Sequence, residues 1–331
     1  MSDSNFISRI RSSIHIMIEL RLGYAVVSTG LILLGYFWNK LEGYSLEYIV
    51  LVVSIFFANV FMFVVNDYYD APHDSFDPVK RTRNVFCSPE TVNLGKTILY
   101  SSFLLSLALS AVVSLPIFVI VILFDALAYA YSAPPIKLRN RLYWDWIFVI
   151  FWKGLIIAAS YVYFFGTDLA PTPFMYGTLT IILLSSIINQ MDNQIRDFKV
   201  DKVNNSGHSV QHLGHETSSL VKSALLTLFF AFSLAFSYFL SLYVTIAVIV
   251  LNVSLYCIVN PRKYTTVLEL TNVWVVLIFL EYFKPYFSFE QQLIFSLWVI
   301  AMAVLVVIHA KRYNLFEDRR TFQLRSLPEE T

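Results

Sequence analysis

Ten long apolar segments recur along this chain of 331 residues. Each approaches the roughly 20 mostly apolar residues that a helix needs to cross the hydrocarbon core of a bilayer. Segments of this length exclude a membrane β-barrel, because its strands need only about ten residues of alternating polarity. The sequence therefore predicts an all-α integral membrane protein, with apolar segments at 22–39, 47–66, 96–114, 115–131, 146–165, 173–191, 219–240, 241–259, 266–283 and 289–310.

The composition also indicates a membrane protein. Hydrophobic residues make up 57% of the chain and charged residues 14%, whereas charged residues form about a quarter of an average soluble domain. The polar residues 1–21 precede a full-length apolar segment, so no removable signal peptide is expected. The net charge of +1 gives no indication of a nucleic-acid partner. We predict an N-terminal segment over 1–21, a transmembrane domain over 22–310 and a charged tail over 311–331.

The basic residues are distributed unequally between alternate connections. Twenty Lys and Arg residues lie in the two termini and in every second connection, and the remaining connections hold only Lys40 and Lys284. Because Lys and Arg accumulate in cytoplasmic loops, both termini and the long acidic loops are expected to face the cytoplasm. Two termini on one side require an even number of spans, which favours ten.

The first polar stretch follows the second apolar segment and contains Asn66, Asp67, Asp70 and Asp74. On a continuing helix Asp70 lies three residues from Asp67 and four from Asp74, so these carboxylates share one face. Such hard oxygen ligands suit Mg²⁺, which is usually held by one or two carboxylates together with substrate phosphates. Pro72 is expected to kink the helix or to end it just ahead of this residue, which would place Asp74 in a loop.

A second polar stretch follows the sixth apolar segment. Asn193, Asp197 and Asp201 are spaced by four residues, so a continuing helix places them on one face. Both stretches are predicted on the cytoplasmic side of the membrane. Two carboxylate clusters there can face each other and hold Mg²⁺ ions with a diphosphate between them, and a metal-bound diphosphate is a good leaving group.

Two acidic motifs and a signature between them match a known pattern. The stretch NDYYDAPHD at 66–74 has the form NDxxDxxxD, and the second acidic motif matches at Asp197 and Asp201, with Gln194 at a position where Asp is usual. The stretch YSAPPIKL at 131–138 is similar to a signature that follows the fourth helix. Together these motifs resemble the UbiA-type intramembrane prenyltransferase superfamily over most of the first 260 residues.

The resemblance implies a bundle of helices around a central cavity, with a polar cap at the cytoplasmic face. Members of this family commonly have nine helices, whereas the distribution of basic residues favours ten, so we expect nine to ten spans. The implied reaction is Mg²⁺-dependent transfer of a polyprenyl group from a prenyl diphosphate to a lipophilic acceptor in the membrane. The acceptor would be apolar or amphipathic: an aromatic compound, a quinone precursor or an isoprenoid.

The resemblance also implies roles for individual residues. The expected Mg²⁺ ligands are Asp67, Asp70, Asp74, Asp197 and Asp201. Asn66 and Tyr131 are further candidate catalytic residues, since an aromatic face such as that of Tyr131 can stabilise an allylic cation. Candidate substrate-binding residues, most of them cations able to hold phosphates, are Lys80, Arg83, Lys137, Arg139, Asn193, Arg196 and Lys153. The expected partners are a prenyl diphosphate donor, a lipophilic acceptor and membrane lipid.

These signals also have simpler interpretations. The acidic stretches can be solvated loops, and Lys80 and Arg83 can serve only to orient the protein in the membrane. Tyr131 can be an interfacial aromatic residue. Lys153 lies within an apolar segment, where an ionisable residue usually faces the bundle interior, but a long side chain there can also extend to the membrane surface.

Two other functions are compatible with parts of the sequence. An ion or solute transporter can also use acidic helix ends, although carboxylates clustered beside the cytoplasm rather than at the bilayer midplane favour metal-phosphate chemistry. His208, His212 and His215 have a spacing that suits zinc on a helix. Gly207 and Gly214, however, indicate irregular backbone around these histidines.

Overall fold

The structure, a computed structural model, describes residues 22–39, 45–76, 81, 84–167, 173–203 and 207–238. The chain divides into two units, Met1–Phe236 and Ser237–Thr331, and nearly all described residues belong to the first. Several predictions lie outside the described residues and stay predictions: the segments 241–259, 266–283 and 289–310, the terminal segments 1–21 and 311–331, and the residues Lys80 and Arg83.

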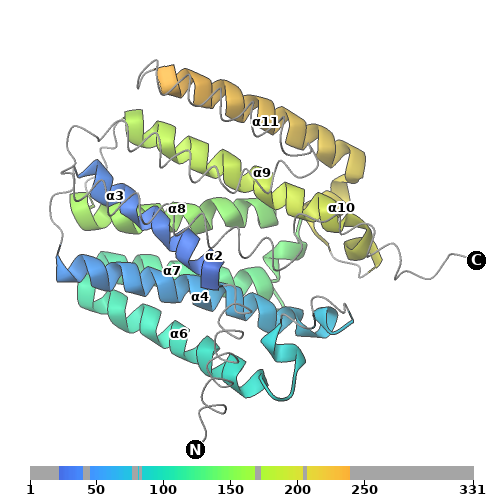
Figure 1. Cartoon of the computed structure of the whole chain (residues 1–331), viewed down its shortest axis with the longest axis horizontal. Coiled ribbons are helices and arrows are strands. Elements are labelled where there is room, and N and C mark those ends of the chain that lie inside the picture. Colours follow the sequence, from blue (N-terminus) through green and yellow to red (C-terminus); the bar gives the residue numbers. More distant parts are fainter. Residues whose placement is uncertain are drawn as a thin grey trace, which may run out of the picture. The chain divides into compact units, whose positions relative to one another are not determined.

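Every regular element in the described residues is a helix (Figure 1). The α-helices in chain order are α2 (Leu22–Thr29), α3 (Leu33–Trp38), α4 (Leu46–Asp74), α6 (Val92–Val113), α7 (Leu115–Ser132), α8 (Trp144–Phe165), α9 (Pro173–Val203), α10 (Ser209–Leu213) and α11 (His215–Tyr238). Three short 3-10 helices connect them, η1 (Gly30–Ile32), η2 (Val85–Cys87) and η3 (Leu138–Asn140).

Four of these helices, α4, α6, α7 and α8, are long and apolar enough to cross a membrane. They begin and end within a few residues of the predicted segments, except that α4 runs eight residues past its predicted end at residue 66. The first predicted segment, 22–39, is helical throughout but changes to 3-10 geometry at Gly30–Ile32. In the described residues these helices agree with the predicted all-α fold, and four of them have the length and composition of membrane spans.

Polar caps fix where two of the four spanning helices, α4 and α7, begin. The Ser45 hydroxyl accepts a hydrogen bond from the Tyr48 backbone N–H at 3.3 Å and starts α4. In the same way Ser114 accepts from Ile117 N–H at 3.4 Å and starts α7, directly after α6 ends. A side-chain oxygen at this position satisfies one of the backbone donors that a helix leaves unpaired at its first turn.

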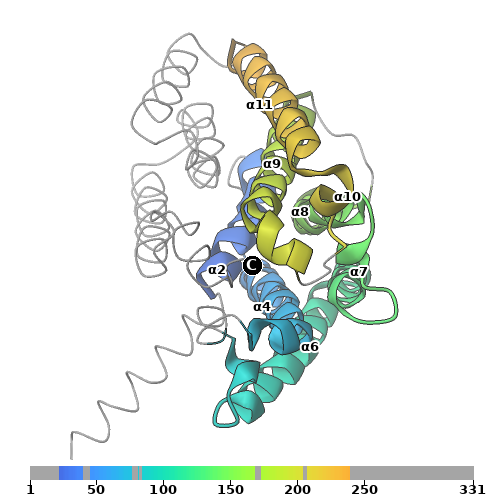
Figure 2. The same ribbon diagram turned by 90° about the vertical axis from the view of Figure 1, so that its right-hand side faces the viewer.

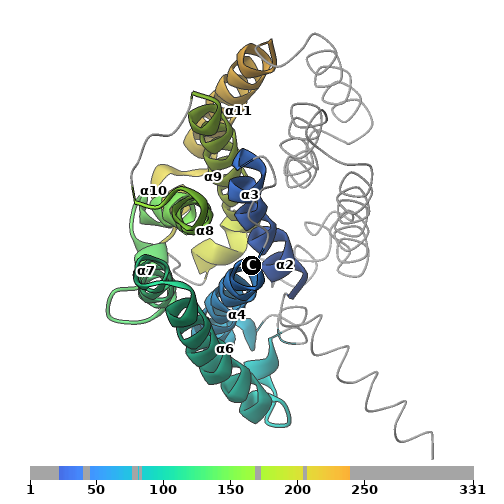
Figure 3. The same cartoon turned by 90° about the vertical axis from the view of Figure 1, so that its left-hand side faces the viewer.

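Helix α4 packs against α6 and α7, and α7 continues the packing to α8, which contacts α9 (Figure 2). Leu51, Ile55 and Ala58 of α4 are fully buried in these contacts. Helix α3 packs on α8, as Figure 3 shows from the opposite side. Helix α4 also contacts α2, so one long helix with three helical neighbours organises the described part of the bundle.

A buried polar link joins three spanning helices. Ser54 of α4 donates to the Ser106 carbonyl of α6 at 2.8 Å, and the Ser106 hydroxyl donates to the Asp125 carboxylate of α7 at 2.7 Å. Asp125 is an ionisable residue within a span that the sequence reasoning did not single out. Its partners show that it joins α6 to α7 within the bundle.

The expectation that Pro72 ends α4 is wrong. The helix continues through Pro72 to Asp74, so Asp74 is a helical residue and not part of a loop. Pro72 has no backbone N–H, so the helix lacks one hydrogen bond there. Because Pro72 lies near the helix end, this loss affects only the last turns. The Ser75 hydroxyl donates to the Pro72 carbonyl at 2.8 Å and helps to close this last turn.

Candidate active site

The last two turns of α4 carry the first acidic motif. The Asn66 amide donates to Asp70 Oδ2 at 2.9 Å, and Asn66 Oδ1 accepts from the Ser132 hydroxyl of α7 at 3.3 Å. Asp67 is buried, whereas Asp70 and Asp74 are partly exposed. The motif is therefore helical, as the spacing predicted, and Asn66 connects it to the end of α7.

Asn84 stabilises the same helix end from a distant loop. Its amide nitrogen donates to the Asp67 carbonyl at 2.7 Å and to Asp74 Oδ2 at 2.9 Å, while its amide oxygen accepts from the Phe86 N–H at 3.0 Å. The sequence reasoning gave Asn84 no role. Only its place at the end of the polar stretch could have indicated one, because nothing local to the sequence shows that the chain folds back onto α4.

Arg139 of η3 forms an ion pair with Asp70, from Nη1 to Oδ1. Arg139 is nearly buried, with only 7% of its surface exposed. Its Nε has no hydrogen-bond partner among the described residues. Lys137 lies two residues earlier in left-handed backbone geometry. Burial lowers the pKa of Lys137, and the nearby Arg139 charge lowers this pKa further. A predicted phosphate-binding residue and a predicted metal ligand thus contact each other directly.

The Tyr131 side chain packs between helices of the bundle. Its ring stacks on Phe148 of α8 with 4.1 Å between centroids, and its hydroxyl accepts a hydrogen bond from the Gln190 amide of α9 at 3.3 Å. The aromatic series continues from Phe148 to Trp152 at 6.5 Å and from Trp152 to Phe63 of α4 at 5.8 Å. Aromatic rings therefore extend from the polar helix ends into the apolar part of the bundle.

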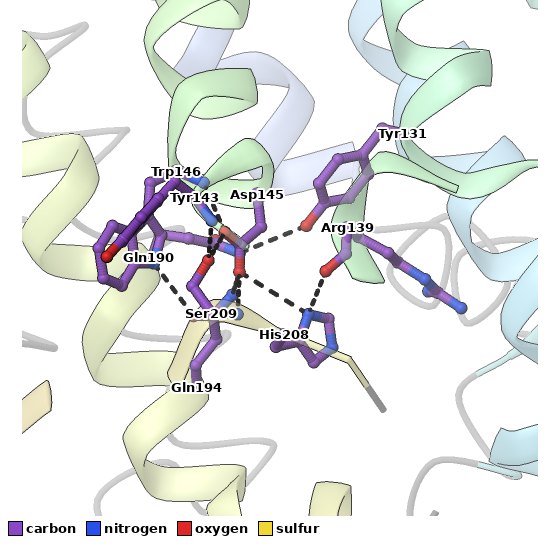
Figure 4. Close-up of polar contacts among 9 residues, drawn as sticks. All are labelled: Tyr131, Arg139, Tyr143, Asp145, Trp146, Gln190, Gln194, His208 and Ser209. Carbon is purple, nitrogen blue, oxygen red and sulfur yellow. Dashed lines mark hydrogen bonds and ion pairs between the residues drawn. The ribbon is translucent and has the colours of Figure 1, made fainter. Parts of the chain in front are cut away.

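A fully buried carboxylate, Asp145 at the start of α8, connects the loops that follow α7 and α9 (Figure 4). Its Oδ1 accepts from the Trp146 N–H at 2.9 Å and from the Ser209 hydroxyl. Its Oδ2 accepts from the Ser209 N–H at 2.9 Å and from the Gln194 amide at 2.5 Å. Four donors on one carboxylate satisfy the rule that buried charges must be hydrogen-bonded. The sequence reasoning missed Asp145, since one Asp beside an apolar segment carries no distinctive spacing.

His208 lies between Asp145 and the loop that carries Arg139 (Figure 4). Its Nδ1 lies 2.9 Å from the Arg139 carbonyl oxygen and 4.0 Å from Asp145 Oδ2. Burial lowers the pKa of His208, and the Asp145 charge opposes this shift only in part. His212 is exposed, and among the described residues no three His, Cys, Asp or Glu side chains are grouped to hold a metal ion. His208 therefore contacts the loop that carries Arg139. It is not arranged with His212 and His215 as a zinc site.

The second acidic motif lies in the last turns of α9, which extends as one helix to Val203. Asn193 is exposed, and Asp197 and Asp201 are partly exposed. Asp192 forms an ion pair with Lys222 of α11 at 2.8 Å. Arg196 lies in the same turns, and its side chain is outside the described residues.

Contacts with the end of α7 place the polar parts of α4 and α9 at the same end of the bundle. The consecutive residues Tyr131 and Ser132 bond to Gln190 of α9 and to Asn66 of α4, respectively. Asp197 lies seven residues beyond Gln190, or about 10 Å along the helix at 1.5 Å per residue. In Figure 1 the C-terminal ends of α4 and α9 both lie on the right-hand side.

The oxygen donors at the end of α4 fit Mg²⁺ better than a transition metal. Asp67, Asp70 and Asp74 supply carboxylate oxygens, and Asp70 is paired with a cation that can also bind phosphate. Mg²⁺ needs no complete protein cage, because substrate phosphates and water usually complete its shell. The carboxylates at the end of α4 can therefore take part in binding Mg²⁺ although they form no closed cluster within the described residues.

Lys153 does not join the residues around Arg139. Its ammonium group donates to the Ser28 hydroxyl of α2 at 3.1 Å and lies 4.0 Å from the centre of the Trp152 ring. It is eight residues beyond Asp145 on α8, or about 12 Å along the helix axis. The structure therefore places Lys153 deeper in the bundle than the predicted diphosphate site.

Comparisons with known proteins agree with the fold. A homologue of UbiA from Archaeoglobus fulgidus, solved with GPP and Mg²⁺, has a TM-score of 0.61 at 16% identity, with 82% of this chain and 99% of that chain covered. A homologue from Aeropyrum pernix K1 in its apo form has a TM-score of 0.57 at 13% identity, with 86% and 97% covered. A structure of a digeranylgeranylglyceryl phosphate synthase has a TM-score of 0.53 at 15% identity, with 83% and 99% covered.

The sequence itself gives the family. None of the curated proteins compared with the chain is significantly similar to it. The model of the UbiA prenyltransferase family, however, matches residues 26–267, which is well over half of the chain. This family and the four apolar helices that can span a bilayer agree with the resemblance of the acidic motifs. The chain therefore belongs to the UbiA prenyltransferase family and is an integral membrane prenyltransferase.

Proposed function

We propose that this protein transfers a polyprenyl group from a prenyl diphosphate to a lipophilic acceptor within the membrane, in a reaction that depends on Mg²⁺. The observation that carries the proposal is the contact between Asp70 and Arg139 at the polar end of α4. Asp70 is a ligand of the type that Mg²⁺ prefers, and Arg139 is a cation of the type that binds phosphate. The metal ion and the diphosphate thus each have a binding partner at the same place.

The residues have distinct roles in this reaction. Mg²⁺, when bound, neutralises charge that develops on the departing diphosphate oxygen. Asp70, Asp67 and Asp74 would hold it from α4, and Asp197 and Asp201 from α9. Asn66 orients the Asp70 carboxylate through the hydrogen bond between their side chains. The phosphates would be bound by Arg139 and Lys137, with further contacts from Lys80, Arg83, Asn193 and Arg196.

Loss of the diphosphate leaves an allylic cation on the prenyl group, which must be kept from water until the acceptor attacks. Tyr131 and Phe148 present stacked rings next to the polar helix ends. An aromatic face stabilises a cation by about 0.5–2 kcal/mol. Trp152 and Phe63 continue this aromatic surface toward the apolar region where the rest of the prenyl chain would lie.

The acceptor is proposed to be an aromatic compound, a quinone precursor or an isoprenoid that enters from the lipid. Homologues of UbiA from Archaeoglobus fulgidus were solved with GPP or DMAPP bound together with Mg²⁺. By analogy we propose prenyl diphosphates as the donors here. The distribution of basic residues supports a site that faces the cytoplasm. The transporter alternative gains no support, because the family to which the chain belongs consists of prenyltransferases.

The test uses the purified full-length protein with Mg²⁺, a set of labelled prenyl diphosphates and a membrane-lipid extract. We expect release of diphosphate and a labelled lipophilic product, both lost when Mg²⁺ is chelated and in the Asp70→Ala and Asp197→Ala variants. Glu90→Ala is the matched control, since Glu90 is exposed in the connection that follows α4. Absence of diphosphate release with every donor, or release that both Asp variants leave unchanged, would contradict the proposed function.

A further inference from the structure

We propose that the Asp70–Arg139 ion pair is a latch that makes the metal ion and the diphosphate bind as one unit, each poorly without the other. This inference rests on the proposed function and concerns how the same site is filled. The two groups that would receive the metal and the phosphate are bound to each other. A metal ion and a diphosphate that fill the site together would replace this contact with contacts of their own.

Both oxygens of Asp70 are already occupied. Oδ1 is paired with the Arg139 guanidinium, and Oδ2 accepts a hydrogen bond from the Asn66 amide. Each oxygen keeps a further lone pair, so a metal ion can reach this carboxylate by sharing an oxygen with Arg139 or Asn66, or by displacing one of these donors. Sharing places a divalent cation beside a guanidinium, and like charges at such distances repel each other.

A diphosphate alone meets the converse problem. A diphosphate that binds Arg139 brings its own negative charge close to the Asp70 carboxylate, which repels it. Arg139 is 7% exposed, so its charge is poorly screened by water and loses much if left without a counter-ion. Only a metal-diphosphate group offers a cation to Asp70 and an anion to Arg139 at once.

The surroundings of Arg139 allow it to change partners without moving its backbone. The Arg139 carbonyl is fixed by His208, which in turn lies beside the fully buried Asp145. The Arg139 Nε has no hydrogen-bond partner among the described residues, so this nearly buried side chain has one donor available for a further hydrogen bond. An incoming phosphate oxygen would satisfy this donor, which makes the exchange of Asp70 for phosphate favourable.

The latch predicts effects on binding that a simple list of ligands does not. Removing Arg139 frees Asp70, so metal alone should bind more tightly to Arg139→Gln than to the natural protein. Removing the Asp70 charge frees Arg139, so diphosphate alone should bind more tightly to Asp70→Asn. Couplings between two sites are usually about 5–150-fold, and we expect at least about 5-fold in each of these two experiments.

The experiment measures binding to the full-length protein in detergent micelles, without turnover. Mn²⁺ replaces Mg²⁺ as the metal probe, its binding followed by electron paramagnetic resonance, and inorganic pyrophosphate in the presence of a chelator is the anion probe. Arg141→Gln is the control for Arg139→Gln, because Arg141 is exposed and its Nε donates to the Ile136 carbonyl at 3.0 Å. Asp74→Asn is the control for Asp70→Asn, since it removes the same charge one turn away.

The outcomes separate the two proposals. Tighter Mn²⁺ binding to Arg139→Gln than to Arg141→Gln, and tighter pyrophosphate binding to Asp70→Asn than to Asp74→Asn, support the latch. Equal or weaker binding in both comparisons overturns it, even if metal and pyrophosphate together still bind to the natural protein. If Mn²⁺ and pyrophosphate together do not bind to the natural protein, the proposed function itself is wrong. Arg139→Lys keeps the charge and should bind Mn²⁺ as weakly as the natural protein, so it reveals a defect that is only structural.

Discussion

Gln194 donates a hydrogen bond to the Asp145 carboxylate at 2.5 Å, and its amide oxygen accepts one from the Trp146 indole at 3.1 Å. Both ends of this buried amide are therefore occupied within the protein. Gln194 stands where the second acidic motif of the family usually has an Asp. Here its amide holds the Asp145 carboxylate in place, and it supplies no carboxylate of its own. Metal binding from α9 is accordingly proposed for Asp197 and Asp201 alone.

Restoring the usual residue at this position should harm the protein. Gln194→Asp places a second carboxylate against the fully buried Asp145 and removes the donor that Asp145 now accepts. An uncompensated buried charge lowers the free energy of unfolding by about 3–5 kcal/mol. Thermal unfolding in detergent measures this loss. Asn193→Asp, one residue away and exposed, should change stability by less than about 0.5 kcal/mol. A Gln194→Asp variant as stable as Asn193→Asp would show that this interpretation is wrong.

Asn84→Ala should weaken the end of α4. The change removes two hydrogen bonds, to the Asp67 carbonyl and to Asp74 Oδ2, and leaves the Phe86 N–H without its acceptor. Loss of buried hydrogen bonds of this kind costs about 1–3 kcal/mol, and the loosened Asp74 should reduce Mn²⁺ affinity in the presence of pyrophosphate. Asn93→Ala, at an exposed position of α6, provides the comparison. Unchanged unfolding temperature and metal affinity in Asn84→Ala would count against this role.

Gly207→Ala should separate the loops that Asp145 connects. A methyl group on Gly207 would lie 2.5 Å from the Asn140 carbonyl oxygen, next to Arg139, so the backbone of η3 would have to move. Overpacking of this kind costs about 1–3 kcal/mol, and pyrophosphate affinity should fall with it. Gly154→Ala is the matched control, because nothing lies within 4 Å of its new methyl group and Ala favours a helix. Equal effects from the two changes would contradict the close approach at Gly207.

Stability should fall in mild acid because of His208. Burial holds the pKa of this imidazole below its ordinary value of 6.5 in the folded protein. As the pH falls through 6.5, the unfolded chain therefore binds the proton more readily than the folded one, so stability is lost until the lower folded pKa is reached. Unfolding temperatures at pH 7.5 and below pH 6 measure the effect. His208→Gln should show a smaller decrease than the natural protein, and His212→Gln, at an exposed position, should not.

The sequence predicted the membrane class, the first acidic motif and its helical spacing, because each depends on residues that are neighbours along the chain. Apolar length alone identifies α4, α6, α7 and α8. The contact between Asp70 and Arg139 was not predicted, although both residues were candidates, since 69 positions separate them and only the fold brings them together. Asp145 and Asn84 were missed for the same reason: their importance depends on partners from distant loops.

The interpretation of Pro72 shows how a local rule can be correct and still mislead. Proline removes one backbone donor wherever it occurs, but near a helix end that loss is small, and other contacts can offset it. Asn84 and Ser75 both bond to the last turns of α4. The C-cap residue Ser75 and the distant Asn84 thus both stabilise the turn that follows the proline and carries Asp74.

Because α4 is a single helix from the membrane interior to its acidic end, it sets the register between the apolar and charged halves of the site. Asn59 bonds to Trp152 at 2.9 Å, and Asp70 contacts Arg139 eleven positions later on the same rod. Each residue of a helix turns by about 100°. Inserting one residue between Asn59 and Asp70 would rotate the carboxylates to another side of the helix, while Asn59 would keep its contact with Trp152. The length of α4 between Asn59 and Asp74 is therefore fixed by the site.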